Sequence, residues 1–171
     1  SIPGGLKAPM SNSHSSPRAE FPSTNSDLWH LYVQTYNGIA SYLDKVLRKQ
    51  ANIKLDDFNI LTVLTQGGIQ SDPPQVVRMG EIAADLSVSP SRLTYQIERL
   101  IHLGWVDRIP VKEDRRGKGV FITDAGYKHY MNARAIHTDL MDTVVMAGLN
   151  AKEANALASA LKHMRQSVQF D

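Results

Sequence analysis

The fold is decided by residues 79–123, MGEIAADLSVSPSRLTYQIERLIHLGWVDRIPVKEDRRGKGVFIT. Apolar residues at steps of three and four predict two helices here, over 79–86 and 90–103, joined by the turn 87–89. Ser89 before Pro90 suits an N-cap followed by the first helical position, because proline lacks an N–H that would be unpaired there. Gly104 is placed to end the second helix in a left-handed conformation.

After Gly104 the apolar period changes from helical to alternating. Residues 105–111 and 120–123 are predicted to be the two strands of a hairpin, and the polar, glycine-containing stretch 112–119 is its tip. A helix-turn-helix followed by a β-hairpin is a winged helix. The sequence therefore predicts a mainly α fold with a small β-hairpin wing.

The flanking segments are predicted to be helical. An apolar stripe over 28–47 indicates a long helix capped by Ser26 or Asp27, and a shorter helix begins at Asp56 or Asp57 and stops at Gly67-Gly68. Residues 70–77 are expected to be a loop. A helix capped by Asp124 runs to about residue 146, and a last helix opens at Asn150 or Ala151. We therefore expect four segments: 1–27 (a vector scar before Met10 plus a disordered arm), 28–55, 56–123 and 124–171.

Composition excludes several kinds of site. The 171 residues include no cysteine, so the chain itself forms no disulfide, zinc–thiolate site or iron–sulfur cluster. No apolar run is long enough to span a bilayer, and we expect a soluble intracellular protein. The net charge is only +2, but residues 88–118 carry seven Lys or Arg against four Asp or Glu. This localised basic segment favours an anionic partner, with a solvated charged face as the alternative.

The second helix of a helix-turn-helix can lie in the major groove of DNA with its N-terminal side chains at base edges. We expect Ser91, Arg92, Tyr95 and Gln96 to meet base edges from the exposed face, and Ser89 and Arg99 to contact phosphate. Thr94 lies at the same end. An ordinary amphipathic surface helix is the alternative.

The hairpin tip adds a second basic element. Arg115, Arg116 and Lys118 are clustered there, and an extended arginine can enter a narrow minor groove. Asp114 is expected to pair with one arginine and to hold the hairpin in shape. A charged turn that binds nothing is the alternative.

Over roughly residues 26–168 the chain resembles the multiple antibiotic resistance regulator (MarR) family of bacterial winged-helix repressors. The resemblance rests on LSVSPSRLT at 86–94, LGWVDR at 103–108, EDRR at 113–116 and FITDAG at 121–126. It implies that Arg116 is the minor-groove arginine and Asp114 its structural partner. It also implies a homodimer built from the N- and C-terminal helices, which acts in the cytoplasm, at the nucleoid when DNA-bound, as a ligand-responsive repressor of a pseudo-palindromic operator.

Other functions receive less support from the sequence. No catalytic motif, cofactor motif or metal-ligand spacing is apparent, so we expect neither an enzyme nor a cofactor. The resemblance implies a small aromatic or phenolic effector, which we place near Trp29, His30, Tyr32 or Tyr36, although packing of these residues at an interface is an equal alternative. Two other functions stay open: a winged helix that binds protein rather than DNA, and a helical ligand-binding protein with an incidental basic wing.

Overall fold

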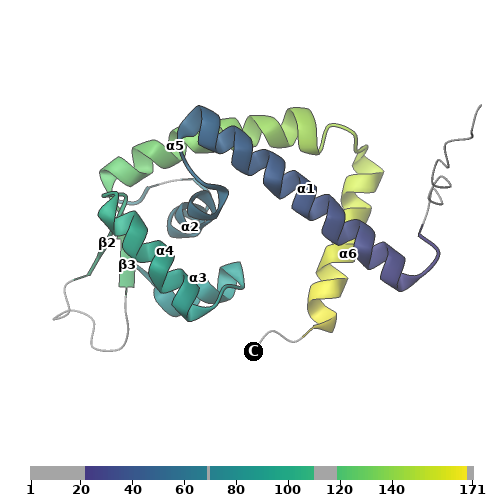
Figure 1. Cartoon of the computed structure of the whole chain (residues 1–171), viewed down its shortest axis with the longest axis horizontal. Coiled ribbons are helices and arrows are strands. Elements are labelled where there is room, and N and C mark those ends of the chain that lie inside the picture. Colours follow the sequence, from purple (N-terminus) through teal and green to yellow (C-terminus); the bar gives the residue numbers. More distant parts are fainter. Residues whose placement is uncertain (1–21, 69, 110–118, 169–171) are drawn as a thin grey trace, which may run out of the picture. The chain divides into compact units, whose positions relative to one another are not determined.

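The computed structural model describes residues 22–68, 70–109 and 119–168 (Figure 1). The chain divides into two compact units, with the boundary after Gly38, inside the first helix. None of the described helices is long and apolar enough to cross a membrane. The described elements are α1 (Asn25–Ala51), α2 (Leu55–Thr65), β1 (Val77–Arg78), α3 (Met79–Leu86), α4 (Pro90–His102), β2 (Val106–Arg108), β3 (Gly119–Ile122), α5 (Asp124–Leu140), a π-helical turn η1 (Met141–Val145) and α6 (Ala151–Ser167).

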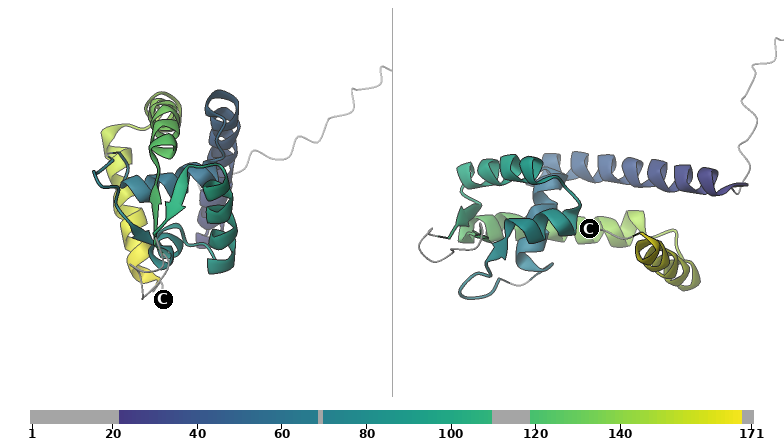
Figure 2. Two further views of the ribbon diagram at one scale, coloured as in Figure 1. Left: turned by 90° about the vertical axis from the view of Figure 1, so that its left-hand side faces the viewer. Right: turned by 90° about the horizontal axis from the view of Figure 1, so that it is seen from below.

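In the first unit, residues 22–38 form the first half of α1, which is a single uninterrupted helix (Figure 2). Its cap differs from the one predicted. The hydroxyl of Thr24 accepts the backbone N–H of Asp27 at 3.1 Å, so Ser26 and Asp27 already lie inside the helix. A threonine hydroxyl pairs a first-turn N–H as well as serine or aspartate does, and sequence alone does not choose among adjacent candidates.

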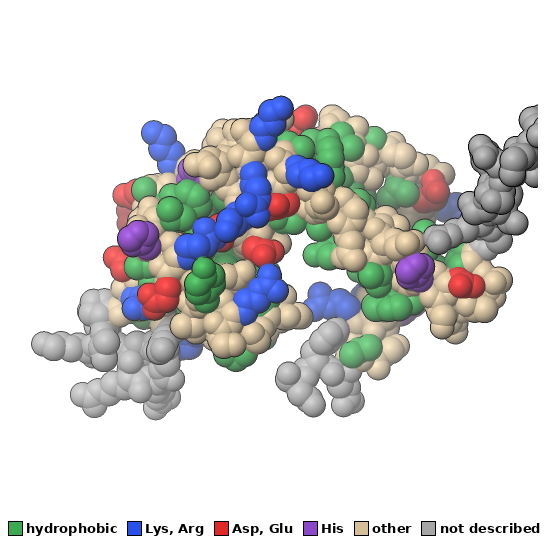
Figure 3. Space-filling view, viewed as in Figure 1, with side chains coloured by type: hydrophobic (Ala, Val, Ile, Leu, Met, Phe, Trp, Pro, Cys, Tyr) green, Lys and Arg blue, Asp and Glu red, His purple; other side chains and the backbone are tan. Residues whose placement is uncertain are grey.

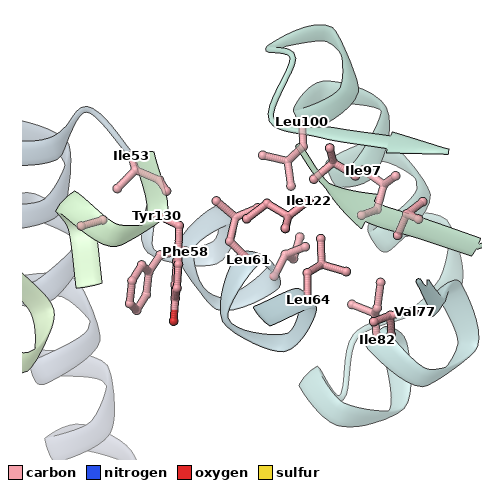
Figure 4. Packing of buried hydrophobic residues seen from close by; sticks show 14 of the residues in the cluster. Ile53, Phe58, Leu61, Leu64, Val77, Ile82, Ile97, Leu100, Ile122 and Tyr130 are labelled. Carbon is pink, nitrogen blue, oxygen red and sulfur yellow. The ribbon is translucent and has the colours of Figure 1, made fainter. Parts of the chain in front are cut away.

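The core of the second unit is built around α2, whose residues Phe58, Ile60, Leu61 and Leu64 are all buried. Leu61 and Leu64 point toward Ile97 and Leu100 of α4 and Ile122 of β3, while Phe58 lies beside Tyr130 of α5 (Figure 4). A helix that is apolar on more than one side must be covered on more than one side. For this reason α2 contacts α3, α5 and β3 directly.

The helix-turn-helix prediction is confirmed. The turn residue Ser87 adopts a left-handed conformation (φ 52°), and Ser89 caps α4 by accepting the backbone N–H of Arg92 at 3.2 Å. Gly104 has φ 78° and ends α4 as expected. The predicted apolar positions Leu93, Ile97 and Leu100 are buried.

The sheet contains a strand that the sequence did not indicate. Val77, the last residue of the expected loop, and Arg78 pair antiparallel with β3, with Val77 opposite Val120, and give the order β1-β3-β2. The predicted hairpin pairing is present, with Val106 opposite Ile122. A side chain on Gly119 would collide with Ile109 and Val76, so glycine lets these two residues cover the sheet.

Helix α5 is joined tightly to the exit of α4. Thr123, not Asp124 as predicted, caps α5, because its hydroxyl accepts the N–H of Gly126 at 3.0 Å while donating to the carbonyl of Gly104 at 2.6 Å. Gly126 packs directly on the backbone carbonyl of Trp105, where no Cβ would fit. The start of α5 is therefore fixed against the C-terminal end of α4.

The helix predicted to reach residue 146 ends its α-helical part at Leu140 and continues as η1. The last helix is capped as predicted: Asn150 accepts the N–H of Glu153 at 2.8 Å, and the Glu153 carboxylate accepts the N–H of Asn150 at 3.1 Å. Apart from the half-buried Leu161, all residues of α6 are exposed in the single chain.

His137 of α5 supplies a pH-dependent contribution to stability. Its ring stacks on Phe58 at 4.7 Å between centroids, and burial lowers its pKa from the ordinary 6.5. The unfolded chain therefore takes up this proton below pH 6.5 while the folded one does not. We expect the free energy of unfolding to fall as pH drops through 6.5 toward the lower folded pKa.

Urea unfolding of the wild type and of His137→Phe between pH 5 and 8 measures this contribution. The phenylalanine keeps a ring on Phe58 but binds no proton, so the free energy of unfolding of the wild type should fall relative to that of the variant as pH drops. Parallel curves would show that His137 titrates normally in the folded protein.

Candidate nucleic-acid interface

The first two turns of α4 present a polar, exposed face. Ser91, Thr94 and Tyr95 are exposed, and the Tyr95 side chain has 72% of its surface accessible. Thr94 donates its hydroxyl hydrogen to the carbonyl of Pro90 at 2.9 Å, which leaves the hydroxyl oxygen available as an acceptor. The opposite face of the helix is fixed in the core, so these three side chains project from a rigid support.

Arg92 occupies the edge between this exposed face and helix α2. Its guanidinium Nη2 donates to Oδ2 of Asp56 at 3.0 Å, and both side chains are more than half exposed, at 60% and 57%. The pair connects the third position of α4 to the first turn of α2. Arg92 is exposed, as predicted, but it has a partner that was not predicted, and its contact with a base edge stays a prediction.

Arg99 does not have the predicted environment. Its guanidinium forms an ion pair with Asp57 of α2, whose carboxylate is 2% exposed. Removing a carboxylate from water is costly unless a cation meets it, so Arg99 is committed to the protein interior. Arg99 therefore has a structural role that was not predicted, and its contact to phosphate stays a prediction.

The expectation that Gln96 lies on the exposed face is wrong. Gln96 is buried, and its Oε1 has no hydrogen-bond partner among the described residues. Helical spacing explains the difference: residues 92, 96 and 99 form one stripe, and the two ion pairs turn that stripe toward α2. The predicted contact between Gln96 and a base edge is not tested by this geometry and stays a prediction.

The other end of α4 is tied to the sheet, where Glu98 forms an ion pair with Arg108 of β2. The two arginines and the glutamate of α4 are therefore all paired with neighbouring elements. On the face drawn in Figure 3, Lys and Arg side chains accordingly lie beside Asp and Glu side chains instead of forming a purely basic patch. Direct recognition by α4 would depend on its hydroxyl and phenol groups and on those pairs that can open.

The remaining site predictions are not tested by this geometry. Asp114, Arg115, Arg116 and Lys118 lie outside the described residues. Ser89 is confirmed as the cap of α4, while its contact to phosphate stays a prediction. Within the described ranges, no group of three histidine, aspartate or glutamate side chains is arranged to hold a metal ion.

The residues predicted to bind an effector belong to the first half of α1. Trp29, His30, Tyr32 and Tyr36 are all exposed in the single chain, and Trp29 stacks on Tyr32 with ring centroids 5.5 Å apart. Exposed aromatic side chains suit either a ligand or a protein interface, and effector binding here stays a prediction.

Sequence reasoning missed Asp56 and Asp57 as partners of the recognition helix. Two adjacent carboxylates at the start of an otherwise apolar helix were interpreted as capping residues, but α2 begins at Leu55, after Lys54. The signal that could have revealed them is the buried position of Asp57, one residue before the core residue Phe58. A carboxylate in that position needs a cation from another element.

The two ion pairs are expected to differ in their effect on stability. Arg99→Ala leaves Asp57 buried without its cation and should lower the free energy of unfolding by about 3 kcal/mol. Arg92→Ala breaks an exposed pair and should cost less than about 1 kcal/mol. Denaturant unfolding of both variants measures the contrast. Equal losses would show that the Asp57–Arg99 pair does not anchor α4.

Comparison with known sequences supports the interpretation of this region. The family model described as "MarR family" matches residues 69–118, which include β1, α3, α4 and β2. The chain is 33% identical over 85 residues to the HTH-type transcriptional regulator PecS of Dickeya dadantii, and 36% identical over 98 residues to the uncharacterized HTH-type transcriptional regulator YpoP of Bacillus subtilis. These matches cover 50% and 57% of this chain but only 48% of PecS and 60% of YpoP.

The fold is shared over a greater length. The structure is similar to that of Sco3205, a MarR family transcriptional regulator from Streptomyces coelicolor solved in complex with DNA. The TM-score is 0.75 at 23% identity, with 92% of this chain and 94% of that chain covered. This similarity covers nearly the whole of both chains and shows that they share a fold.

Proposed function

We propose that this chain is a sequence-specific transcriptional regulator that binds double-stranded DNA, and the match of the family model described as "MarR family" to residues 69–118 supports this. The observation that carries the proposal is the exposed face of Ser91, Thr94 and Tyr95 on the first two turns of a helix whose other side is fixed in the core. A recognition helix needs both the exposed polar end and the rigid support.

The groups on this face suit DNA in different ways. Hydroxyl groups of Ser91 and Thr94 can donate to or accept from base edges, and the Tyr95 ring offers an apolar surface with a polar tip. In the first turn of α4, Pro90 has no N–H and the N–H of Arg92 is bonded to Ser89, so the N–H of Ser91 is the backbone donor placed to meet phosphate. Arg116 in the minor groove and Lys118 on the backbone complete the proposal from the sequence.

We further propose that the protein acts as a homodimer. Large apolar side chains are exposed in the single chain on both terminal helices, among them Leu28, Trp29 and Leu31 on α1 and Leu157 and Met164 on α6. Apolar stripes of this kind usually mark surfaces that another chain covers. A symmetric dimer would present two copies of α4 to half-sites about 10 base pairs apart on a pseudo-palindrome.

Release from DNA by a small aromatic or phenolic ligand completes the proposed role, with operator binding in the cytoplasm as the repressing state. The aromatic residues of α1 are the candidates for ligand contact. Exposure of these residues fits a dimer interface equally well, because a second chain could cover the same side chains.

Selection of duplexes from a random pool, followed by fluorescence anisotropy over a salt series, tests the function. The wild type should enrich a pseudo-palindrome and lose affinity steeply as salt rises, because each neutralised phosphate releases counterions. Tyr95→Ala should weaken binding to the selected sequence by about 1–3 kcal/mol and relax preference at one position of each half-site. Lys118→Ala should instead weaken all duplexes alike.

Lys152→Ala on α6 is the matched control for loss of a surface cation away from the winged helix, and it should bind as the wild type does. No enrichment and no salt dependence with the wild type would contradict DNA binding and would favour a protein-interaction role for the winged helix.

A further inference from the structure

The two ion pairs that join α4 to α2 differ in one property that bears on DNA binding. Asp57 is 2% exposed and its partner Arg99 is 28% exposed, whereas Asp56 and Arg92 are 57% and 60% exposed. A buried pair cannot be opened without leaving a charge in the core. An exposed pair exchanges readily with water, because its net strength is small.

Arg92 is also placed to choose between two partners. It is the third residue of α4, next to the exposed Ser91 and three residues before the exposed Tyr95. Residues three apart on a helix are neighbours, so Arg92 borders the exposed face as well as α2. The long side chain of arginine can therefore meet either the Asp56 carboxylate or an anion on the side of Ser91 and Tyr95.

We propose that Asp56 is an affinity-determining residue of the DNA interface, which competes with DNA for Arg92. This inference rests on the proposed function. The Arg92 guanidinium donates to Asp56 at 3.0 Å, so a DNA phosphate that bonds to this guanidinium must displace the Asp56 carboxylate. Both carboxylate and phosphate accept charge-assisted hydrogen bonds from arginine, and one contact offsets much of the other.

The competition explains why α2 carries two carboxylates rather than one. Asp57 fixes the recognition helix through Arg99. Asp56 is not needed for that purpose, and it neutralises a cation that would otherwise strengthen binding to every duplex. Asp56 therefore lowers the affinity of the protein for DNA below the value it would have if Arg92 were unpaired.

A double-mutant cycle on the selected duplex tests the proposal, with Asp56→Asn, Arg92→Ala and the double variant. Asp56→Asn should tighten binding about two- to fivefold, the range that an exposed ion pair supports. The same change in the Arg92→Ala background should leave affinity unchanged within about 1.5-fold, since the contested cation is gone. The gain from Asp56→Asn should shrink as salt rises, because salt screens the exposed pair.

Asp85→Asn, which removes an exposed carboxylate from α3, is the matched control for general repulsion between protein and DNA. It should tighten binding less than Asp56→Asn does. Thermal unfolding of each variant confirms that the fold is retained.

Three results would overturn the inference. Equal tightening by Asp56→Asn with and without Arg92 would show general charge repulsion instead of competition. Weaker binding by Asp56→Asn would show that Asp56 positions Arg92 for DNA. Failure of the wild type to bind any duplex would overturn the proposed function and, with it, the inference, so this failure is distinct from the first two.

Discussion

The buried carboxylate of Asp57 and the guanidinium of Arg99 form the contact on which the orientation of helix α4 depends. A carboxylate that is 2% exposed must be met by a cation, and the cation available to it comes from α4. Helix α2 in turn contacts α3, α5 and β3. The ion pair thus links α4 to α2, the helix that contacts most of the other elements of the second unit.

A second set of contacts fixes the far end of the recognition helix. Thr123 bonds to the Gly104 carbonyl, Gly126 packs on the Trp105 carbonyl, and Glu98 pairs with Arg108. Together with the apolar contacts of Leu93, Ile97 and Leu100, these leave α4 little freedom to rotate about its axis. A fixed rotation decides which side chains face outward, and for that reason Ser91 and Tyr95 are exposed while Gln96 is buried.

Local features of the fold could be predicted from the sequence, because their causes are local. The Ser89 cap, the Gly104 terminator and the start of the last helix at Asn150 or Ala151 each depend on residues within four positions of one another, and each was found where expected. Strand β1 was missed because two residues carry no periodicity and are defined by their pairing with β3, more than 40 residues away.

The candidate site was less predictable for the same reason. The exposure of Gln96 and the partner of Arg99 depend on the angle at which α4 meets α2, and helical spacing alone does not set that angle. The sequence pattern indicated α4 and its N-terminal end as the candidate site. It could not predict which polar residues at that end are exposed to solvent and which contact α2. Asp56 and Asp57 hold Arg92 and Arg99 against α2, but in the sequence they were interpreted only as residues that start a helix.

Hydrogen–deuterium exchange with and without the selected duplex tests most directly whether α4 meets DNA with its N-terminal end. The first-turn amides of α4 have no helical acceptors, and those that contact phosphate should gain protection. The account predicts increased protection over residues 89–95 when DNA is bound, with no comparable change over α2. Protection that appears elsewhere in the chain while residues 89–95 exchange unchanged would contradict it.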